Sequence, residues 1–193
     1  MKHKISDLKF TIKKLVPEDV CKYFIEFYEK NVEHAETEMS YKHEKKLIIR
    51  DNYHCINLTK HSEENKYFLE PLNLAKTYIK LMVVNYTMYI QKKICPTYDM
   101  NVISDSYNVR ILKYEKGQSI KDHTDVSGTI RASCTLNLNE DYEGGEFRFF
   151  NGQEKVSFKT GDGMIFPAEP IWIHGTEPIT KGARYSINCF LHA

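Results

Sequence analysis

The 193-residue chain has few of the features that would place it outside ordinary globular proteins. Its N-terminus, MKHKISDLKF, lacks the apolar segment of a secretory signal peptide. Nowhere does the chain contain the run of about 18 apolar residues that a transmembrane helix needs. The net charge of +1 gives no argument for nucleic acid or an anionic membrane as a partner. We therefore expect a cytoplasmic protein that binds neither.

Cysteine is also scarce. The five cysteines are odd in number and widely spaced, and they form no CxxC pair of the kind that binds zinc or works in redox enzymes. We expect them to be reduced and buried. Apolar residues make up 41% of the chain and charged residues 27%, which are ordinary values and leave little room for extended disorder. The length suits a single domain over residues 1–193, large enough to bury a core without staples.

Residues 1–96 predict a mainly helical support region. Pro17 stands where proline is favoured, at the first turn of a helix, and apolar residues at near-helical spacing continue to about Glu33. A longer helix follows Pro71 and extends to about Lys93. Weaker signals predict a short strand at 8–15 and, within the polar segment 34–66, an edge strand at 46–50.

After Pro96 the pattern changes to short alternating or β-branched runs separated by turns that contain Gly, Asn and Asp. This pattern is typical of an antiparallel barrel or sandwich. The candidate strands are 107–114, 131–138, 145–149, 155–158, 164–166, 172–176 and 183–191. Because helices come first and strands follow, the predicted class is α+β, with residues 97–193 as the β-rich core.

A candidate metal site begins at His123 and Asp125, which lie two residues apart in KDHTD. On a strand both side chains point to the same side and can hold one ion. His174, in WIHGTEP, offers a second imidazole. Two imidazoles and one carboxylate leave other coordination positions open, the arrangement that suits non-haem Fe(II) with O2 and a co-substrate. By itself HxD is a weak signal, because it occurs by chance in many proteins.

Arg184, ten residues after His174, strengthens the signal. We expect a strand over 184–190 to lie beside the strand of His174 and to aim the Arg184 guanidinium into the barrel. An inward-facing arginine is costly unless it meets an anion, and its planar fork matches a carboxylate. Ser186 would face the same way and offer a hydroxyl to that carboxylate. The alternative is an arginine at a strand end that pairs with a surface glutamate.

Four motifs follow one another between residues 108 and 192. They are VRILKYEKGQSIKDHTD, LNLNEDYEGGEFRFF, KTGDGMIFP and HGTEPITKGARYSIN. In order and separation they resemble the Fe(II)/2-oxoglutarate dioxygenases, and within them the prolyl 4-hydroxylase-like branch. The resemblance implies a double-stranded β-helix, or jelly-roll barrel, with N-terminal helices packed against its major sheet.

The resemblance also implies roles for individual residues. His123, Asp125 and His174 match the metal triad, Arg184 matches the residue that holds the distal carboxylate of 2-oxoglutarate, and Tyr114 matches a tyrosine of that pocket. The implied reaction converts 2-oxoglutarate and O2 to succinate and CO2 and hydroxylates a C–H bond, with ascorbate as supporting reductant. The expected substrate is a prolyl residue in a peptide or protein, because the motif similarity is strongest with that branch.

Several alternatives stay open. The same chemistry can serve another amino acid side chain, a free amino acid, a nucleobase or another small molecule. A barrel that binds metal without catalysis, or a zinc-dependent hydrolase with the same triad, has no need for Arg184 and Ser186 as a dicarboxylate anchor. Segments 97–107 and 126–129 are candidate loops that close over a peptide. The roles of Arg131, Asn137 and Trp172 and the oligomeric state are left open.

Overall fold

The computed structural model describes residues 4–37, 42–43, 46–47, 53–99 and 103–193. The strands are β1 (Phe10–Ile12), β2 (Glu36–Thr37), β3 (Lys42–His43), β4 (Lys46–Leu47), β5 (His54–Asn57), β6 (Asp105–Tyr114), β7 (Ile130–Asn137), β8 (Glu143–Gly144), β9 (Phe147–Phe149), β10 (Glu154–Val156), β11 (Gly163–Pro167), β12 (His174–Thr176), β13 (Ile179–Lys181) and β14 (Arg184–His192). The helices are α1 (Glu18–Lys30), α2 (Leu58–Glu64) and α3 (Leu69–Lys93), with short 3-10 turns at Ile5–Leu8, Val32–His34 and Lys66–Phe68.

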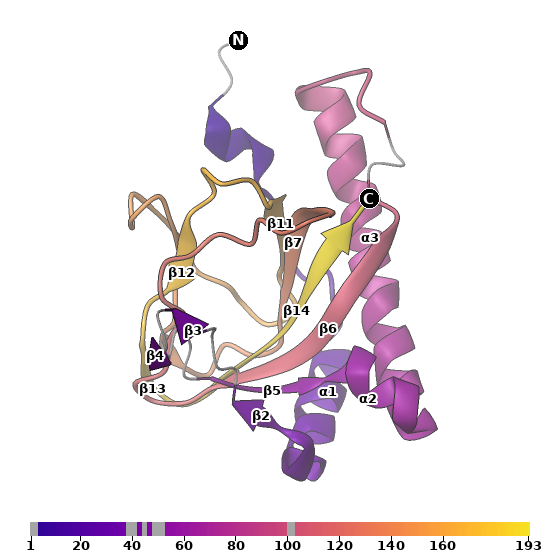
Figure 1. Cartoon of the computed structure of the whole chain (residues 1–193), viewed down its shortest axis with the longest axis vertical. Coiled ribbons are helices and arrows are strands. Elements are labelled where there is room, and N and C mark those ends of the chain that lie inside the picture. Colours follow the sequence, from indigo (N-terminus) through magenta and orange to yellow (C-terminus); the bar gives the residue numbers. More distant parts are fainter. Residues whose placement is uncertain (1–3, 38–41, 44–45, 48–52, 100–102) are drawn as a thin grey trace.

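A seven-stranded antiparallel sheet, in the order β1-β11-β7-β14-β6-β5-β2, forms one wall of a barrel. A smaller sheet, β10-β9-β12, forms the other wall, as Figure 1 shows with β12 across from β7 and β14. Helix α3 runs along the outside of the larger sheet and contacts β6, β7 and β11. The predicted α+β class and the double-stranded β-helix with helices on its major sheet are confirmed.

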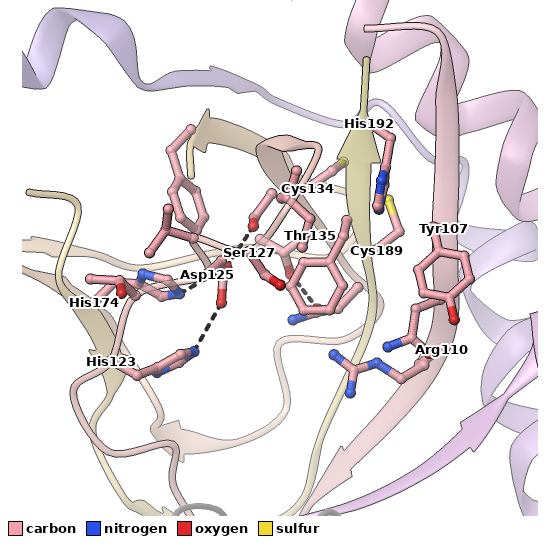
Figure 2. Close-up of a pocket in the computed structure, with 18 of the residues that line it drawn as sticks. Tyr107, Arg110, His123, Asp125, Ser127, Cys134, Thr135, His174, Cys189 and His192 are labelled. Atoms are coloured by element: carbon pink, nitrogen blue, oxygen red, sulfur yellow. Dashed lines mark hydrogen bonds and ion pairs between the residues drawn. The ribbon is translucent and has the colours of Figure 1, made fainter. Parts of the chain in front are cut away.

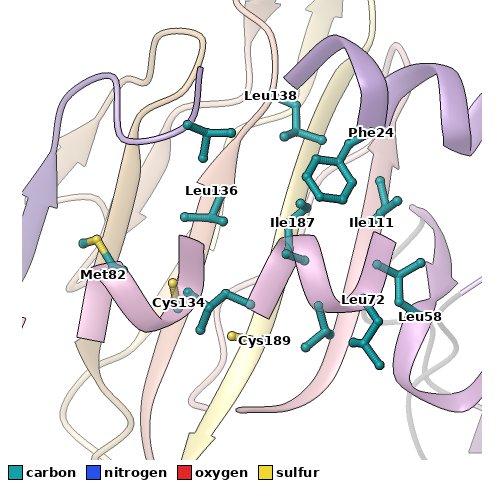
Figure 3. Close-up of a cluster of buried hydrophobic side chains, with 14 of the residues drawn as sticks. Phe24, Leu58, Leu72, Met82, Ile111, Cys134, Leu136, Leu138, Ile187 and Cys189 are labelled. Carbon is teal, nitrogen blue, oxygen red and sulfur yellow. The ribbon is translucent and has the colours of Figure 1, made fainter. Parts of the chain in front are cut away.

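Alternation along the central strands decides which side chains meet the helices. On β6, β7 and β14 most of the residues that point outward are apolar, among them Ile111, Leu136 and Ile187, none of which is exposed. Figure 3 shows these side chains against Phe24 of α1 and Met82 of α3. Because a strand has a side-chain period of two, the intervening residues face the barrel interior.

The two predicted helices are present and begin near the expected prolines. Pro17 is the N-cap residue of α1. The negative charges of Glu18 and Asp19 in the first turn stabilise the helix by interacting with the positive end of its dipole. Helix α3 begins at Leu69, so that Pro71 lies in its first turn, where a proline costs no hydrogen bond. No helix in the described part of the chain is long and apolar enough to cross a membrane.

All candidate strands after residue 96 are present, with ends within two residues of the predicted ones. In the N-terminal half, by contrast, β5 and α2 lie within the segment 34–66, whose sequence is mainly polar. Strand β5 is four residues long and is held in the sheet by pairing with β6, where Ile56 lies opposite Ile111. The strand predicted at 8–15 is shortened to β1, and β4 covers the start of the one predicted at 46–50, whose remainder lies outside the described residues.

Candidate metal centre

His123 does not lie in a regular strand, contrary to expectation, but in an irregular segment attached to β12. The backbone N–H of His123 donates to the carbonyl of His174 and the N–H of His174 donates back, both at 2.9 Å. Thr176 N–H donates to the Ile120 carbonyl at 2.9 Å, and Ile120 N–H donates to the Thr176 hydroxyl at 2.8 Å. These bonds fix the segment that carries His123 and Asp125 onto the strand that carries His174.

Gly175 permits this close approach. A Cβ at this position would lie 2.7 Å from the Ile120 carbonyl oxygen and 2.8 Å from a carboxylate oxygen of Asp122. Asp122 in turn accepts a hydrogen bond from Arg148 Nε at 2.8 Å, and Arg148 also donates to the Thr176 carbonyl at 3.0 Å. The backbone spacing on which the site depends therefore requires glycine here.

The side chains of His123, Asp125 and His174 converge, with one ligand atom from each within 4.8 Å of the others. His123 Nε2 lies 3.2 Å from Asp125 Oδ1, and His174 Nε2 lies 3.3 Å from Asp125 Oδ2 (Figure 2). The opposite ring nitrogens are engaged elsewhere. Nδ1 of His123 lies 2.8 Å from the Lys121 carbonyl, and Nδ1 of His174 lies 2.9 Å from the Trp172 carbonyl. Because a carbonyl only accepts, each Nδ1 carries the proton, and Nε2 of the neutral ring presents a lone pair.

In their neutral form the two imidazoles would offer Nε2 lone pairs to a cation placed beside the Asp125 carboxylate. Burial opposes ionisation of Asp125, but the imidazoles of His123 and His174 favour it, and the net effect holds the pKa of this carboxyl well below its usual range. The Ser133 hydroxyl also donates to Asp125 Oδ2, at 2.5 Å. Two imidazoles and an ionised carboxylate are a donor set that suits Fe(II) and related divalent transition metals. The residues present therefore fit a metal ion.

Aromatic side chains pack against the ring of His174. Phe147 stacks on its ring with centres 5.5 Å apart and planes at 12°, and Phe166 meets it edge-on at 4.7 Å. Trp172, 1% exposed, packs against Phe149 and Phe166 and is absent from the described lining of the neighbouring cavity. Trp172 is thus a core residue, and these rings fix the orientation of the His174 imidazole.

A cavity of about 550 Å³ adjoins the triad and is lined by both sheets. His174 and Phe147 come from the smaller sheet, whereas Arg110, Thr135 and Asn188 come from the larger one. The segment 126–129, which was expected to form a loop over the substrate, lines this cavity. From the described part of the other expected loop, 97–107, Tyr107 lines it. Arg131 is exposed and lies outside the described lining.

Arg184 lies on the opposite sheet from His174, and the expected adjacency of their two strands is wrong. Strand β12 pairs with β9, whereas β14 pairs with β6 and β7. Between them the chain crosses the barrel through β13 and a turn at Gly182, whose φ of +74° favours glycine. The metal ligands and the predicted carboxylate anchor therefore belong to facing walls.

The Arg184 guanidinium is fully inside the barrel, as predicted, with 1% of the residue exposed. Nε donates to Asn137 Oδ1 and Nη1 donates to the Gly145 carbonyl, both at 3.1 Å. Its Cζ lies 5.6 Å from the centre of the Tyr114 ring. Ser186 donates to Asn188 Oδ1 at 3.3 Å. Asn137 thus orients Arg184, and neither Arg184 nor Ser186 is part of the described cavity lining.

Arg110 is a cationic residue of the cavity that sequence reasoning did not identify. It lies on β6, four residues before Tyr114, and only 6% of it is exposed. Residues four apart on a strand share a face, so the spacing from Tyr114 was a usable signal. Arg110 is the second residue of the motif VRILKYEKGQSIKDHTD, but nothing in that motif marks it as functional. Its place in the cavity depends on which face of β6 points inward.

Part of the chain is similar to proteins of known family. Residues 109–192 match the model of the 2OG-Fe(II) oxygenase superfamily. A PKHD-type hydroxylase from Janthinobacterium sp. (strain Marseille) is 36% identical over 90 residues, which cover 38% of this chain and 38% of that protein. The match therefore spans about two fifths of the length of that relative.

Two solved structures share the fold. A prolyl hydroxylase from Trichoplax adhaerens, in complex with a peptide fragment of the hypoxia inducible factor oxygen degradation domain, has a TM-score of 0.62 at 13% identity and covers 97% of this chain and 84% of its own. A Pseudomonas putida prolyl-4-hydroxylase has a TM-score of 0.61 at 15% identity and covers 97% of this chain and 96% of its own. At these identities the similarity establishes the fold.

Proposed function

We propose that the protein is an Fe(II)- and 2-oxoglutarate-dependent dioxygenase that hydroxylates a prolyl residue of a peptide or protein. The match of residues 109–192 to the model of the 2OG-Fe(II) oxygenase superfamily supports the proposal. The observation that carries the proposal is the convergence of two imidazole lone pairs and one carboxylate on a single point beside a cavity. Both Nδ1 atoms lie against backbone carbonyls, so each neutral imidazole would direct its Nε2 lone pair toward the point it shares with the Asp125 carboxylate.

His123, Asp125 and His174 would hold the iron. When bound, the iron supplies the chemistry that couples oxidation of 2-oxoglutarate by O2, to succinate and CO2, with hydroxylation of a C–H bond, and ascorbate serves as the supporting reductant. The carbonyls of Lys121 and Trp172 keep both imidazoles in the tautomer that coordinates through Nε2. Ser133 holds the Asp125 carboxylate in place.

Arg184 would bind the distal carboxylate of 2-oxoglutarate, with Tyr114 and Ser186 in the same pocket. The bonds to Asn137 and the Gly145 carbonyl use two of the five guanidinium N–H groups, so up to three can meet a carboxylate. Since Arg184 lies beyond the described cavity lining, binding requires side chains between the triad and Arg184 to move. Ser186 would also exchange its bond to Asn188 for one to the co-substrate.

The substrate would enter where the cavity opens, beside Tyr107 and Val126, which are 58% and 49% exposed. The segment 126–129 follows Asp125 directly, so a movement of this segment on substrate binding would also move the Asp125 carboxylate, a proposed metal ligand. The aromatic rings around His174 exclude water from that side of the site. Support for a prolyl substrate comes from the fold shared with prolyl hydroxylases and from the four sequence motifs.

The test is conversion of 2-oxoglutarate to succinate by the Fe(II)-loaded protein under air, measured by mass spectrometry with and without a library of proline-containing peptides. We expect succinate to form slowly without peptide and faster with a peptide that gains 16 mass units on proline. This mass gain of about 16 Da corresponds to the addition of one oxygen atom. Ascorbate should increase the number of turnovers.

Absence of both 2-oxoglutarate binding and succinate formation would contradict the proposal. Metal binding without any binding of 2-oxoglutarate would favour a non-catalytic metal-binding barrel or a zinc-dependent hydrolase. Succinate formation accompanied by oxygen addition to another residue, a free amino acid, a nucleobase or another small molecule would retain the dioxygenase and reject the prolyl substrate.

A further inference from the structure

A second buried arginine, Arg110, lies in the wall of the cavity that adjoins the triad. It is on β6, opposite Asn188 of β14 on one side and Asn57 of β5 on the other. Figure 2 shows Arg110 pointing into the cavity from the wall across from His123. Its guanidinium carbon lies 5.4 Å from the centre of the Phe190 ring, and this contact restrains the plane of the guanidinium. The charge is therefore presented to the cavity in a defined orientation.

The polar groups beside Arg110 increase the number of hydrogen-bond donors on this wall. Asn188 Oδ1 accepts from the Thr135 hydroxyl at 2.9 Å and from the Ser186 hydroxyl at 3.3 Å. With its oxygen held by two hydroxyls, Asn188 has its amide N–H groups as donors. A guanidinium and an amide that both donate suit an anion, most strongly a carboxylate that can meet the guanidinium with both oxygens.

The position of Arg110 along β6 distinguishes it from Arg184. Strand β6 begins with exposed residues and ends in the buried Tyr114, which is opposite Arg184. Arg110 lies four residues nearer the exposed end, which is about 13 Å of strand at roughly 3.3 Å per residue. Tyr107, which lines the same cavity, is 58% exposed. An anion at Arg110 is therefore nearer to the opening than one at Arg184.

We propose that Arg110 binds a carboxylate of the substrate and makes the enzyme select target residues that have an acidic group close by in the chain. This inference rests on the proposed dioxygenase function and adds a substrate class to it. The carboxylate comes either from an Asp or Glu side chain beside the target proline or from the main-chain carboxylate of a C-terminal proline. Replacing it by a neutral amide removes the charge-assisted bonds, at a loss of about 10- to 100-fold.

The experiment compares pairs of proline peptides that differ only as Asp or Asn, or as Glu or Gln, at each position that flanks the proline. A further pair carries a C-terminal proline as the free acid or the amide, so that the two sources of carboxylate are separated. We would measure kcat/KM for hydroxylation with Fe(II) and 2-oxoglutarate. In parallel, peptide binding would be measured by calorimetry with Mn(II) and 2-oxoglutarate under nitrogen.

We expect the wild type to prefer the acidic member of at least one pair by about 10- to 100-fold in both measurements. Arg110→Gln should bring this ratio close to one. Arg131→Gln is the matched control, because Arg131 is exposed and lies outside the described cavity lining. That variant should keep the wild-type ratio.

Equal values for the acidic and neutral members of every pair in the wild type would overturn the proposal. It would also be overturned if Arg110→Gln raised the KM for 2-oxoglutarate more than it lowered the acid-to-amide ratio, since Arg110 would then anchor the co-substrate. Acid-selective binding that Arg110→Gln abolishes, without any conversion of 2-oxoglutarate, would reject the dioxygenase function and retain the role of Arg110.

Discussion

The two faces of the larger sheet are both largely buried and yet differ in polarity. The face toward α1 and α3 carries apolar side chains such as Ile111, Leu136 and Ile187. The face toward the barrel interior carries, on the same three strands, Arg110, Ser133, Thr135, Asn137, Arg184, Ser186 and Asn188, all of them buried or nearly so. Solvation cannot account for polar residues on a buried face, because each costs free energy unless it is paired. Several of these interior residues are paired with one another, as Thr135 is with Asn188 and Arg184 with Asn137, whereas the outer face packs through apolar contacts.

The largest effect is expected from removing one metal ligand. His174→Ala should bring succinate formation down to background and abolish the rise in melting temperature on addition of Mn(II), because two ligands do not hold the ion. For the wild type, a metal at about 100 times its Kd adds roughly 2.7 kcal/mol, which corresponds to a rise on the order of 5 to 10 °C. The measurement is thermal unfolding with and without metal. His54→Ala, a histidine outside the triad that contacts Thr37, should keep the rise, and its loss there would mean that the metal binds elsewhere.

A change at Arg184 should separate co-substrate binding from metal binding. Arg184→Ala is expected to raise the KM for 2-oxoglutarate about 100-fold, in line with the loss of charge-assisted bonds, while the Mn(II)-induced rise in melting temperature persists. Arg184→Lys should recover part of the affinity, since the ammonium keeps the charge without the fork. Steady-state kinetics and thermal unfolding check both statements. Equal loss of metal binding in Arg184→Ala and His174→Ala would contradict the separate roles.

Gly175→Ala should damage the metal site without a change in any ligand. The added Cβ would meet the Ile120 carbonyl at 2.7 Å, so the segment with His123 and Asp125 has to move away from β12. We expect the Kd for Mn(II) to rise about tenfold or more, by analogy with the loss of second-shell support. Titration of the metal under nitrogen measures this. Gly152→Ala provides the comparison, because Gly152 has a positive φ, of +81°, but an added Cβ there meets nothing within 4 Å. Unchanged metal affinity in both variants would show that the metal site does not need the close approach of the His123 segment to β12.

Two neighbouring residues of β14 should respond in opposite ways. Ile187→Ala, on the outer face, is expected to cost about 2 to 5 kcal/mol of stability through the cavity it leaves, with the KM for 2-oxoglutarate changed little. Ser186→Ala, on the inner face, should cost only about 0.5 to 1.5 kcal/mol and raise that KM severalfold. Denaturant unfolding and steady-state kinetics of both variants are the measurements. The reverse pattern would remove the distinction between the two faces.

The fold was largely predictable because its signals are local. The short alternating or β-branched runs after Pro96 predicted all the strands there to within two residues except the short β8 and β13, which were not predicted. Pro17 and Pro71 marked where the two main helices begin. Strand β5 was not predictable, because four residues give too little periodicity and its position depends on pairing with β6. The extent of the domain, 1–193, stays a prediction.

The candidate site divides in the same way. The spacing of His123 and Asp125 and the distant His174 predicted a cluster, and the structure brings these three side chains together. The structure does not place His123 in a regular strand, and it sets Arg184 across the barrel from His174 on the larger sheet. Both differences arise from how the chain crosses between sheets at its turns, which a local pattern does not reveal. That the triad holds iron and that Arg184, Tyr114 and Ser186 hold 2-oxoglutarate stay predictions.

By itself the sequence determined the chemistry available to this protein, namely two imidazoles, a carboxylate and an arginine in the order of the family that it resembles. Only the tertiary structure decided the relation among them. Backbone bonds from Ile120 and His123 to β12 aim two Nε2 lone pairs at Asp125, and Asn137 fixes the direction of Arg184. The same packing turns Arg110 toward the cavity. The physical reason is that residue types are local, whereas which wall of a barrel a side chain faces depends on pairing between strands far apart in the sequence.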